Sequence, residues 1–138
     1  MQKQSASMVS INLPAGVNRK MIMDALSLDL KRGIEACYYA ELEQQRYLFV
    51  TDFSVITFIN WNETQIVEAL NQLNLKGVQD FRKQFIFQDY CISESPDLKD
   101  EFVVTNDCVE LKNWSLWPLM IVALAVSQSV GPVSYTHL

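Results

Sequence analysis

Histidine is nearly absent from this chain: the single one, His137, lies one residue from the C-terminus. A chain end frays, so an imidazole there cannot be held within hydrogen-bond reach of a nucleophile. Catalysis by a Ser-His-acid or a Cys-His arrangement is therefore excluded. Glycine is also scarce, with four residues that form neither a Walker nor a dinucleotide-binding motif. We expect no enzyme and no cofactor, because no catalytic or metal-ligand set is complete.

Cysteine occurs only three times, as Cys37, Cys91 and Cys108, without any C-x-x-C pair. An odd number of widely spaced cysteines argues against a disulfide framework and against a zinc site. Each cysteine sits in an apolar run of the sequence. We therefore interpret all three as inert buried thiols in a reducing compartment, rather than as reactive thiols.

Positive charge is in the minority, since eleven Lys and Arg residues stand against sixteen Asp and Glu residues, for a net charge of −5. The basic residues are scattered, and nucleic-acid binding requires a concentrated positive surface, so we expect no nucleic-acid partner. The longest apolar stretch, residues 116–126, is shorter than the roughly twenty residues that span a bilayer. These features predict a soluble, cytoplasmic domain.

A secretory signal is also missing from the first thirty residues, which have no apolar core of the signal-peptide type. A mitochondrial presequence is an alternative that we keep, because Lys3, Arg19 and Lys20 precede the first acidic residue, Asp24. We expect a mitochondrial location if the chain is eukaryotic.

Apolar residues are abundant, at 49% of the chain, and their spacing predicts one hydrophobic core. Alternating patterns predict strands at residues 8–13, 37–42, 47–51, 55–59, 84–91, 102–105 and 108–112. Helical spacing predicts helices from residue 17 to about 33, from 62 to about 76, and over 115–130. The order predicts a single α+β domain whose largely antiparallel sheet is packed by about three helices.

The two later helices carry distinct local signals. Asn62 followed by Gln65 has the spacing of a capping box, and Ile66, Leu70 and Leu73 form one apolar face. Residues 120–126 are apolar all round, so the last helix must be buried in this domain or against a segment that follows it.

Two groups of side chains are candidate functional residues. Phe53, Trp61, Trp114 and Trp117 are candidates for an aromatic surface that binds a partner or a ligand, although a small core also uses aromatic residues for packing. The acidic cluster Glu94, Asp97, Asp100 and Glu101 can hold a hard cation through carboxylate oxygens. The alternative is a solvated loop, which the absence of a glycine-centred calcium-loop spacing favours.

Two stretches resemble a known family. In residues 47–73, the segment VITFINWN (55–62) occupies the place of a "VVFWN" strand that leads into a helix rich in acids and leucines. In residues 102–130, a strand pair is followed by a helix whose ending matches at Ala125, Gln128, Ser129 and Val130. Together they resemble the YagE family, also called Rmd (required for meiotic nuclear division), a domain of unknown function with no established catalytic motif.

The resemblance implies a longer protein. Family members continue beyond this last helix into further helices and a hydrophobic segment that attaches them to a membrane. We therefore expect residues 1–132 to be the N-terminal α+β domain of a truncated YagE-like protein. Residues 133–138 (VSYTHL) resemble the translation of a sequencing adapter and are expected to be a non-native tail. The alternative is a genuine C-terminus after Gly131 and Pro132.

Three functional hypotheses remain. The resemblance implies a non-enzymatic scaffold or tethering protein that binds a protein partner or itself, and that reaches a membrane only through the missing C-terminal region. Aromatic residues near the turns at Asp52 and Asn60 favour, as an alternative, a small-molecule-binding regulatory domain. A hydrolase or transferase that works through the acidic loop is the weakest hypothesis.

Overall fold

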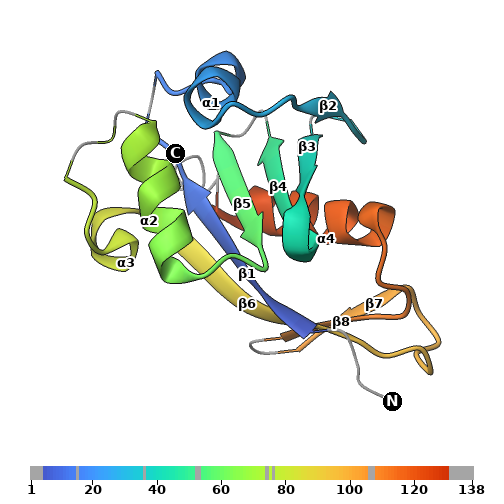
Figure 1. Ribbon diagram of the computed structural model, residues 1–138. Helices are drawn as coiled ribbons and strands as arrows, with labels where there is room; N and C mark the ends of the chain where they lie inside the picture. Colours follow the sequence, from blue (N-terminus) through green and yellow to red (C-terminus); the bar gives the residue numbers. More distant parts are fainter. Residues whose placement is uncertain are drawn as a thin grey trace, which may run out of the picture.

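A mixed sheet forms the centre of the fold. The computed structural model describes residues 5–14, 16–35, 37–51, 54–73, 75, 77–105 and 108–130, and within them the sheet has eight strands in the spatial order β2-β3-β4-β5-β1-β6-β8-β7 (Figure 1). The strands are β1 (Ser5–Asn12), β2 (Lys31–Arg32), β3 (Cys37–Leu42), β4 (Arg46–Thr51), β5 (Val55–Ile59), β6 (Phe87–Glu94), β7 (Phe102–Val104) and β8 (Cys108–Leu111). Neighbours run antiparallel, except for the parallel pair β6 and β8. The prediction of an α+β domain with a largely antiparallel sheet is confirmed.

Helices cover both faces of the sheet. Among the described residues they are α1 (Arg19–Leu26), α2 (Glu63–Gln72), α3 (Phe81–Gln84) and α4 (Leu116–Val130), with a short 3-10 turn, η1 (Glu43–Gln45). The first three pack on one face and α4 on the other, which gives three layers (Figure 1). The sequence predicted about three helices, and α3 is the one that it missed.

The central strand β5 shows why the sheet needs helices on both sides. All five of its residues are buried, as predicted from its unbroken apolar pattern. Ile56 and Phe58 face the layer of α1, α2 and α3, whereas Val55 and Ile59 face α4. Successive strand residues point to opposite faces, so one strand contributes to two separate cores.

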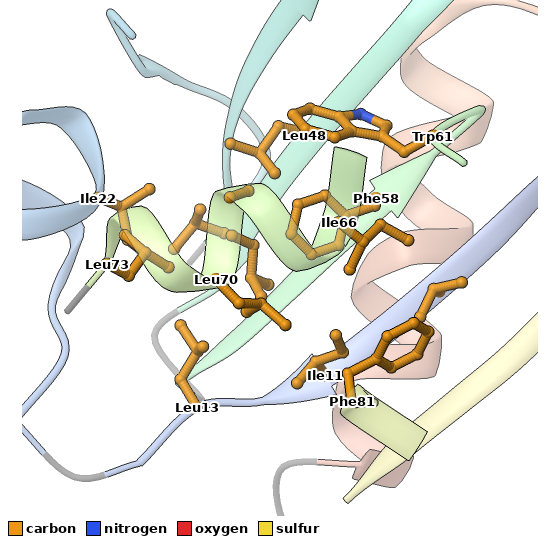
Figure 2. Packing of buried hydrophobic residues seen from close by; sticks show 14 of the residues in the cluster. Ile11, Leu13, Ile22, Leu48, Phe58, Trp61, Ile66, Leu70, Leu73 and Phe81 are labelled. Atoms are coloured by element: carbon orange, nitrogen blue, oxygen red, sulfur yellow. The ribbon is translucent and has the colours of Figure 1, made fainter. Parts of the chain in front are cut away.

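The core beneath α2 is built from the residues that the sequence predicted. Asn62 Oδ1 accepts a hydrogen bond from the Gln65 amide at 2.8 Å, and Gln65 Oε1 accepts one from the Asn62 amide at 3.0 Å, which confirms the capping box. Ile66, Leu70 and Leu73 then pack between Ile22 of α1, Phe58 of β5 and Phe81 of α3 (Figure 2). Burying a side chain such as Leu70 completely contributes about 2 kcal/mol to stability.

The last helix packs inside this domain. Pro118 lies in the first turn of the helix, as predicted. Backbone amides in the first turn have no acceptor within the helix, so the missing N–H of proline costs no hydrogen bond there. Leu119, Met120, Val122, Ala123 and Val126 are buried against β-strand residues that include Phe49, Val55 and Ile92. The prediction that this helix is buried is therefore met for one side, which packs within the domain, whereas Ile121 and Ala125 on the opposite side are exposed.

The C-terminal ends of two helices differ from the predictions. The helix expected to end near residue 33 ends at Leu26, because Ser27 adopts a left-handed conformation (φ 54°) and the Leu28 amide closes the turn on Met23 O at 3.1 Å. Leu30 is still buried, but it reaches the core from the non-helical segment between α1 and β2. The helix from residue 62, expected to end near 76, ends at Gln72.

A helical turn replaces the start of the predicted strand 84–91. Asp80 Oδ1 accepts from the Arg82 amide at 3.1 Å and caps α3, which buries Phe81 and delays β6 to Phe87. Strand β6 then continues to Glu94. The turn predicted at Asn106 and Asp107 lies outside the described residues, although β7 and β8 pair as the expected hairpin.

The prediction of three buried thiols is wrong for two of them. Cys37 is fully buried on the α4 side, whereas Cys91 is exposed and Cys108 is half-buried. The apolar runs around Cys91 and Cys108 belong to strands whose buried residues are Ile92 in β6 and Val109 and Leu111 in β8. Alternation along each strand turns the cysteines to the other, less covered face.

Candidate functional site

The aromatic candidates do not share one surface. Trp61 lies in the core under α2 with only 8% of its surface exposed, on the opposite side of the sheet from α4. Trp114 is half-buried beside the α4 core, and Trp117 on α4 is 54% exposed. Phe53 lies outside the described residues. The structure therefore separates Trp61 from Trp114 and Trp117, which belong to the α4 side of the sheet.

An apolar stripe runs along the outward side of α4. Trp117 and Ile121 are exposed to 54% and 43%, and Ala125 follows them on the same side at the same spacing of four. No residue of α4 carries a charge. We name these three residues the α4 stripe. It exposes aromatic and branched apolar side chains, which are typical of surfaces that bind proteins.

Trp114 fixes the chain that leads into this helix. Its backbone amide donates to Glu94 Oε2 at 3.3 Å, and its ring packs against the core beneath α4. The indole nitrogen is buried and finds no acceptor within the part of the chain that the structure describes. The contact with Glu94 couples the beginning of α4 to the end of β6.

A polar depression of about 440 Å³ lies on the other side of the sheet, between η1 and the start of α2. It is lined by Ser7, Gln44, Arg46, Asn60, Trp61, Asn62 and Gln65. The Arg46 guanidinium lies 4.9 Å from the Trp61 ring centroid, and its Nε donates to Glu43 O at 3.3 Å. Trp61 is held in turn by its indole N–H, which donates to Tyr47 O at 3.0 Å.

The backbone around this depression is unusual. Gln44, Gln45 and Asn60 adopt left-handed conformations, with φ of 61°, 58° and 67°. The Asn60 side chain donates to Gln44 O at 3.0 Å and so joins the two turns. Left-handed non-glycine residues cost energy and are found more often at functional sites. The depression offers one cation and several amides, which can bind an anion, but its lining contains no acid, thiol or imidazole for catalysis.

The acidic cluster does not form a cation site of three ligands. Glu94 bonds the Trp114 amide, whereas Asp97, Asp100 and Glu101 are exposed on the connection from β6 to β7. No group of three or more His, Cys, Asp or Glu residues with metal-binding geometry occurs among the residues described.

Sequence reasoning missed Ile121 and Arg46. The spacing of four between Trp117 and Ile121 is visible in the sequence. A helix that is apolar all round, however, does not show from its sequence which side faces outward. Arg46 takes part in a site only because the pairing of β4 with β5 brings it beside Trp61. Trp61 lies fifteen positions after Arg46 in the chain, so the sequence alone does not show that they are neighbours.

In comparisons with known proteins, no family model, no curated protein and no solved structure matches this chain. Within the described residues, no helix is both long enough and apolar enough to cross a membrane.

Proposed function

We propose that this chain is a non-enzymatic scaffold or tethering domain that binds a protein partner through the α4 stripe. The exposure of Trp117 and Ile121 on a helix whose other side is fully packed carries this proposal. A large aromatic residue beside a branched apolar residue is the usual composition of an interface anchor, because both bury much area at low entropy cost.

The occupant of the α4 stripe is an uncharged, apolar helix of a partner protein. Since α4 carries no charge although the chain as a whole has a net charge of −5, the stripe favours an apolar rather than an ionic partner surface. A straight stripe with a spacing of four fits a second helix laid along it.

The tethering part of the proposal rests on the resemblance to the YagE family. In that reading, a region C-terminal to α4 in the full-length protein attaches it to a membrane, while this domain engages the partner. The domain itself then works in the cytoplasm, or in mitochondria if the source is eukaryotic.

The experiment combines crosslinking with quantitative binding. A photo-crosslinking residue at Ala125 captures the partner in an extract of the source organism, and the purified partner is then titrated with three forms of the chain: wild type, the double variant Trp117→Gln with Ile121→Gln, and Ile86→Gln. Ile86 is the matched control, because it is a branched apolar residue that is 56% exposed and lies outside α4, before β6.

We expect the double variant to bind at least about tenfold more weakly, and Ile86→Gln to bind as the wild type does. Equal binding by all three forms would contradict the proposal. So would a captured partner without an apolar helix, or concentration-dependent self-association that the double variant abolishes, since the occupant would then be a second copy of this chain.

Arg46 favours a second candidate function, the binding of a small anionic molecule. Its guanidinium is stacked on Trp61 at the rim of a depression lined by amide side chains. A ligand that binds there raises the melting temperature of the wild type and not that of Arg46→Met. A screen of amino acids and nucleotides that produces no shift would count against this function.

A further inference from the structure

Two of the three cysteines lie directly opposite each other in the sheet. Strands β6 and β8 run parallel, and their register pairs Cys91 with Cys108. Paired residues of neighbouring strands have Cα atoms about 4.8 Å apart. That spacing lies within the range of roughly 4.4 to 6.8 Å that a disulfide bridges.

Both thiols also point to the same accessible face. The next residues along each strand, Ile92 and Val109, are buried beneath α4, so Cys91 and Cys108 project from the opposite side of the sheet. Cys91 is exposed, as is Ser7, its partner in β1 on the other flank. A small reagent can therefore reach the pair from solvent.

The side chains of Cys91 and Cys108 interact with each other. A hydrogen bond with Cys108 raises the pKa of the Cys91 thiol, and partial burial and the charge of Cys108 act in the same direction. Such an interaction requires the two sulfur atoms to be close. Cys37 is excluded from the pair, because it is fully buried on the α4 side.

We propose that Cys91 and Cys108 form a reversible dithiol–disulfide pair that a small-molecule disulfide of the glutathione class oxidises. The exposed Cys91 thiolate attacks one sulfur of the reagent, forms a mixed disulfide and releases one small thiol. The Cys108 thiolate then attacks the Cys91 sulfur and releases the second. The two protein thiols lose two protons and two electrons, and one small disulfide is reduced to two thiols.

The cross-link changes the edge of the sheet. It closes the chain between Cys91 and Cys108, which contains the acidic connection and β7, and it joins β8 covalently to β6. A closed loop of this length lowers the entropy of the unfolded chain. We expect oxidation to raise the melting temperature by about 5 to 10 °C.

The test uses the whole chain carrying Cys37→Ala, in redox buffers that range from reduced to oxidised glutathione. Mass spectrometry of the intact protein and of its peptides follows the thiols, and Cys91→Ser and Cys108→Ser in the same background are the controls. We expect the parent to lose two hydrogen masses, to yield one peptide pair linked through Cys91 and Cys108, and to melt higher until a dithiol reductant reverses both changes.

The single variants identify the two steps. Cys108→Ser should stop at the glutathione adduct on Cys91, and neither single variant should gain thermal stability. Retention of two free thiols in oxidised buffer would overturn the proposal. It would also be overturned by stable glutathione adducts in the parent without a cross-link, or by cross-links only between molecules.

Discussion

The backbone amide of Ile34 donates a hydrogen bond to Met120 Sδ at 3.2 Å and so joins the segment between β2 and β3 to the first half of α4. The preceding residue, Gly33, leaves room for this contact. A Cβ atom at position 33 would collide with the end of the Met120 side chain and would lie 3.2 Å from Cys37 O. Helix α4 and the segment between β2 and β3 therefore pack closely because position 33 has no side chain.

Replacing Gly33 tests that fit. Gly33→Ala should lower the free energy of unfolding by about 1 to 2 kcal/mol, because the Met120 side chain must leave its position. Urea denaturation measures the effect, and a double-mutant cycle with Met120→Ala assigns it. The cost of Gly33→Ala should shrink in the Met120→Ala background. An unchanged cost would locate the strain at Cys37 O instead.

The capping box of α2 gives a second prediction. Asn62→Ala should destabilise the domain by about 1 kcal/mol, because the Gln65 amide loses its acceptor at the exposed start of the helix. Asn62→Ser is the matched control, since a hydroxyl also caps, and it should remain within a few tenths of a kcal/mol of the wild type. Equal losses in both variants would show that the cap itself does not contribute.

Arg82 ties α3 to two other elements. It bonds Glu63 at the start of α2 and lies 3.2 Å from Asp89 Oδ2 in β6, and its guanidinium is 4.6 Å from the Phe81 ring centroid. Burial lowers the pKa of Arg82, but the bonds and charges of Asp89 and Glu63 outweigh burial and raise it.

Because these side chains are substantially exposed, each ion pair should contribute less than about 1 kcal/mol. Arg82→Met should lower the urea midpoint modestly at low salt and by a smaller amount at high salt, since salt screens exposed pairs. Arg82→Lys should recover only part of the loss, because an ammonium cannot bond two carboxylates in the same fork geometry. A loss that salt does not change would assign the effect to packing on Phe81.

The buried thiol of Cys37 predicts alkaline sensitivity. Burial raises its pKa from the ordinary 9.0 to about 12. The folded state therefore keeps a proton that the unfolded chain loses above pH 9. This stabilisation is complete below pH 9 and is lost as the pH rises towards 12, at about 1.4 kcal/mol per pH unit.

Cys37→Ala should flatten this dependence in denaturation experiments run from pH 8 to about 10.5. Tyr47 contributes in the same direction at higher pH, because burial and then the charge of Glu41 raise its pKa, but it does so in both proteins. Native-state alkylation gives an independent readout. Cys37 should react only after unfolding, whereas Cys91 and Cys108 should react in the folded chain.

Local sequence signals determined most of the secondary structure. Strands at residues 37–42 and 55–59 were predicted with the bounds that the structure has, because side-chain alternation or an unbroken apolar run is visible within a few residues. The Asn62 cap and the position of Pro118 were equally readable, since both depend on residues within one helical turn.

Tertiary packing decided where α1 ends and whether α3 exists. The spacing of Ile22, Leu26 and Leu30 continues a helical pattern, yet the helix ends before Ser27, and Leu30 reaches the core from the non-helical segment that follows. The short helix α3 forms because Phe81 fills the core beneath α2. The stabilisation comes from tertiary packing, which the local sequence pattern does not show.

The candidate sites were decided almost wholly by the tertiary structure. The sequence supplied Trp61, Trp114 and Trp117, but only the sheet places the first apart from the other two. Cys91 and Cys108 are neighbours solely because β6 and β8 pair in one register. Strand pairing joins residues that are distant along the chain, and side-chain periodicity within a strand contains no information about which strand lies beside it.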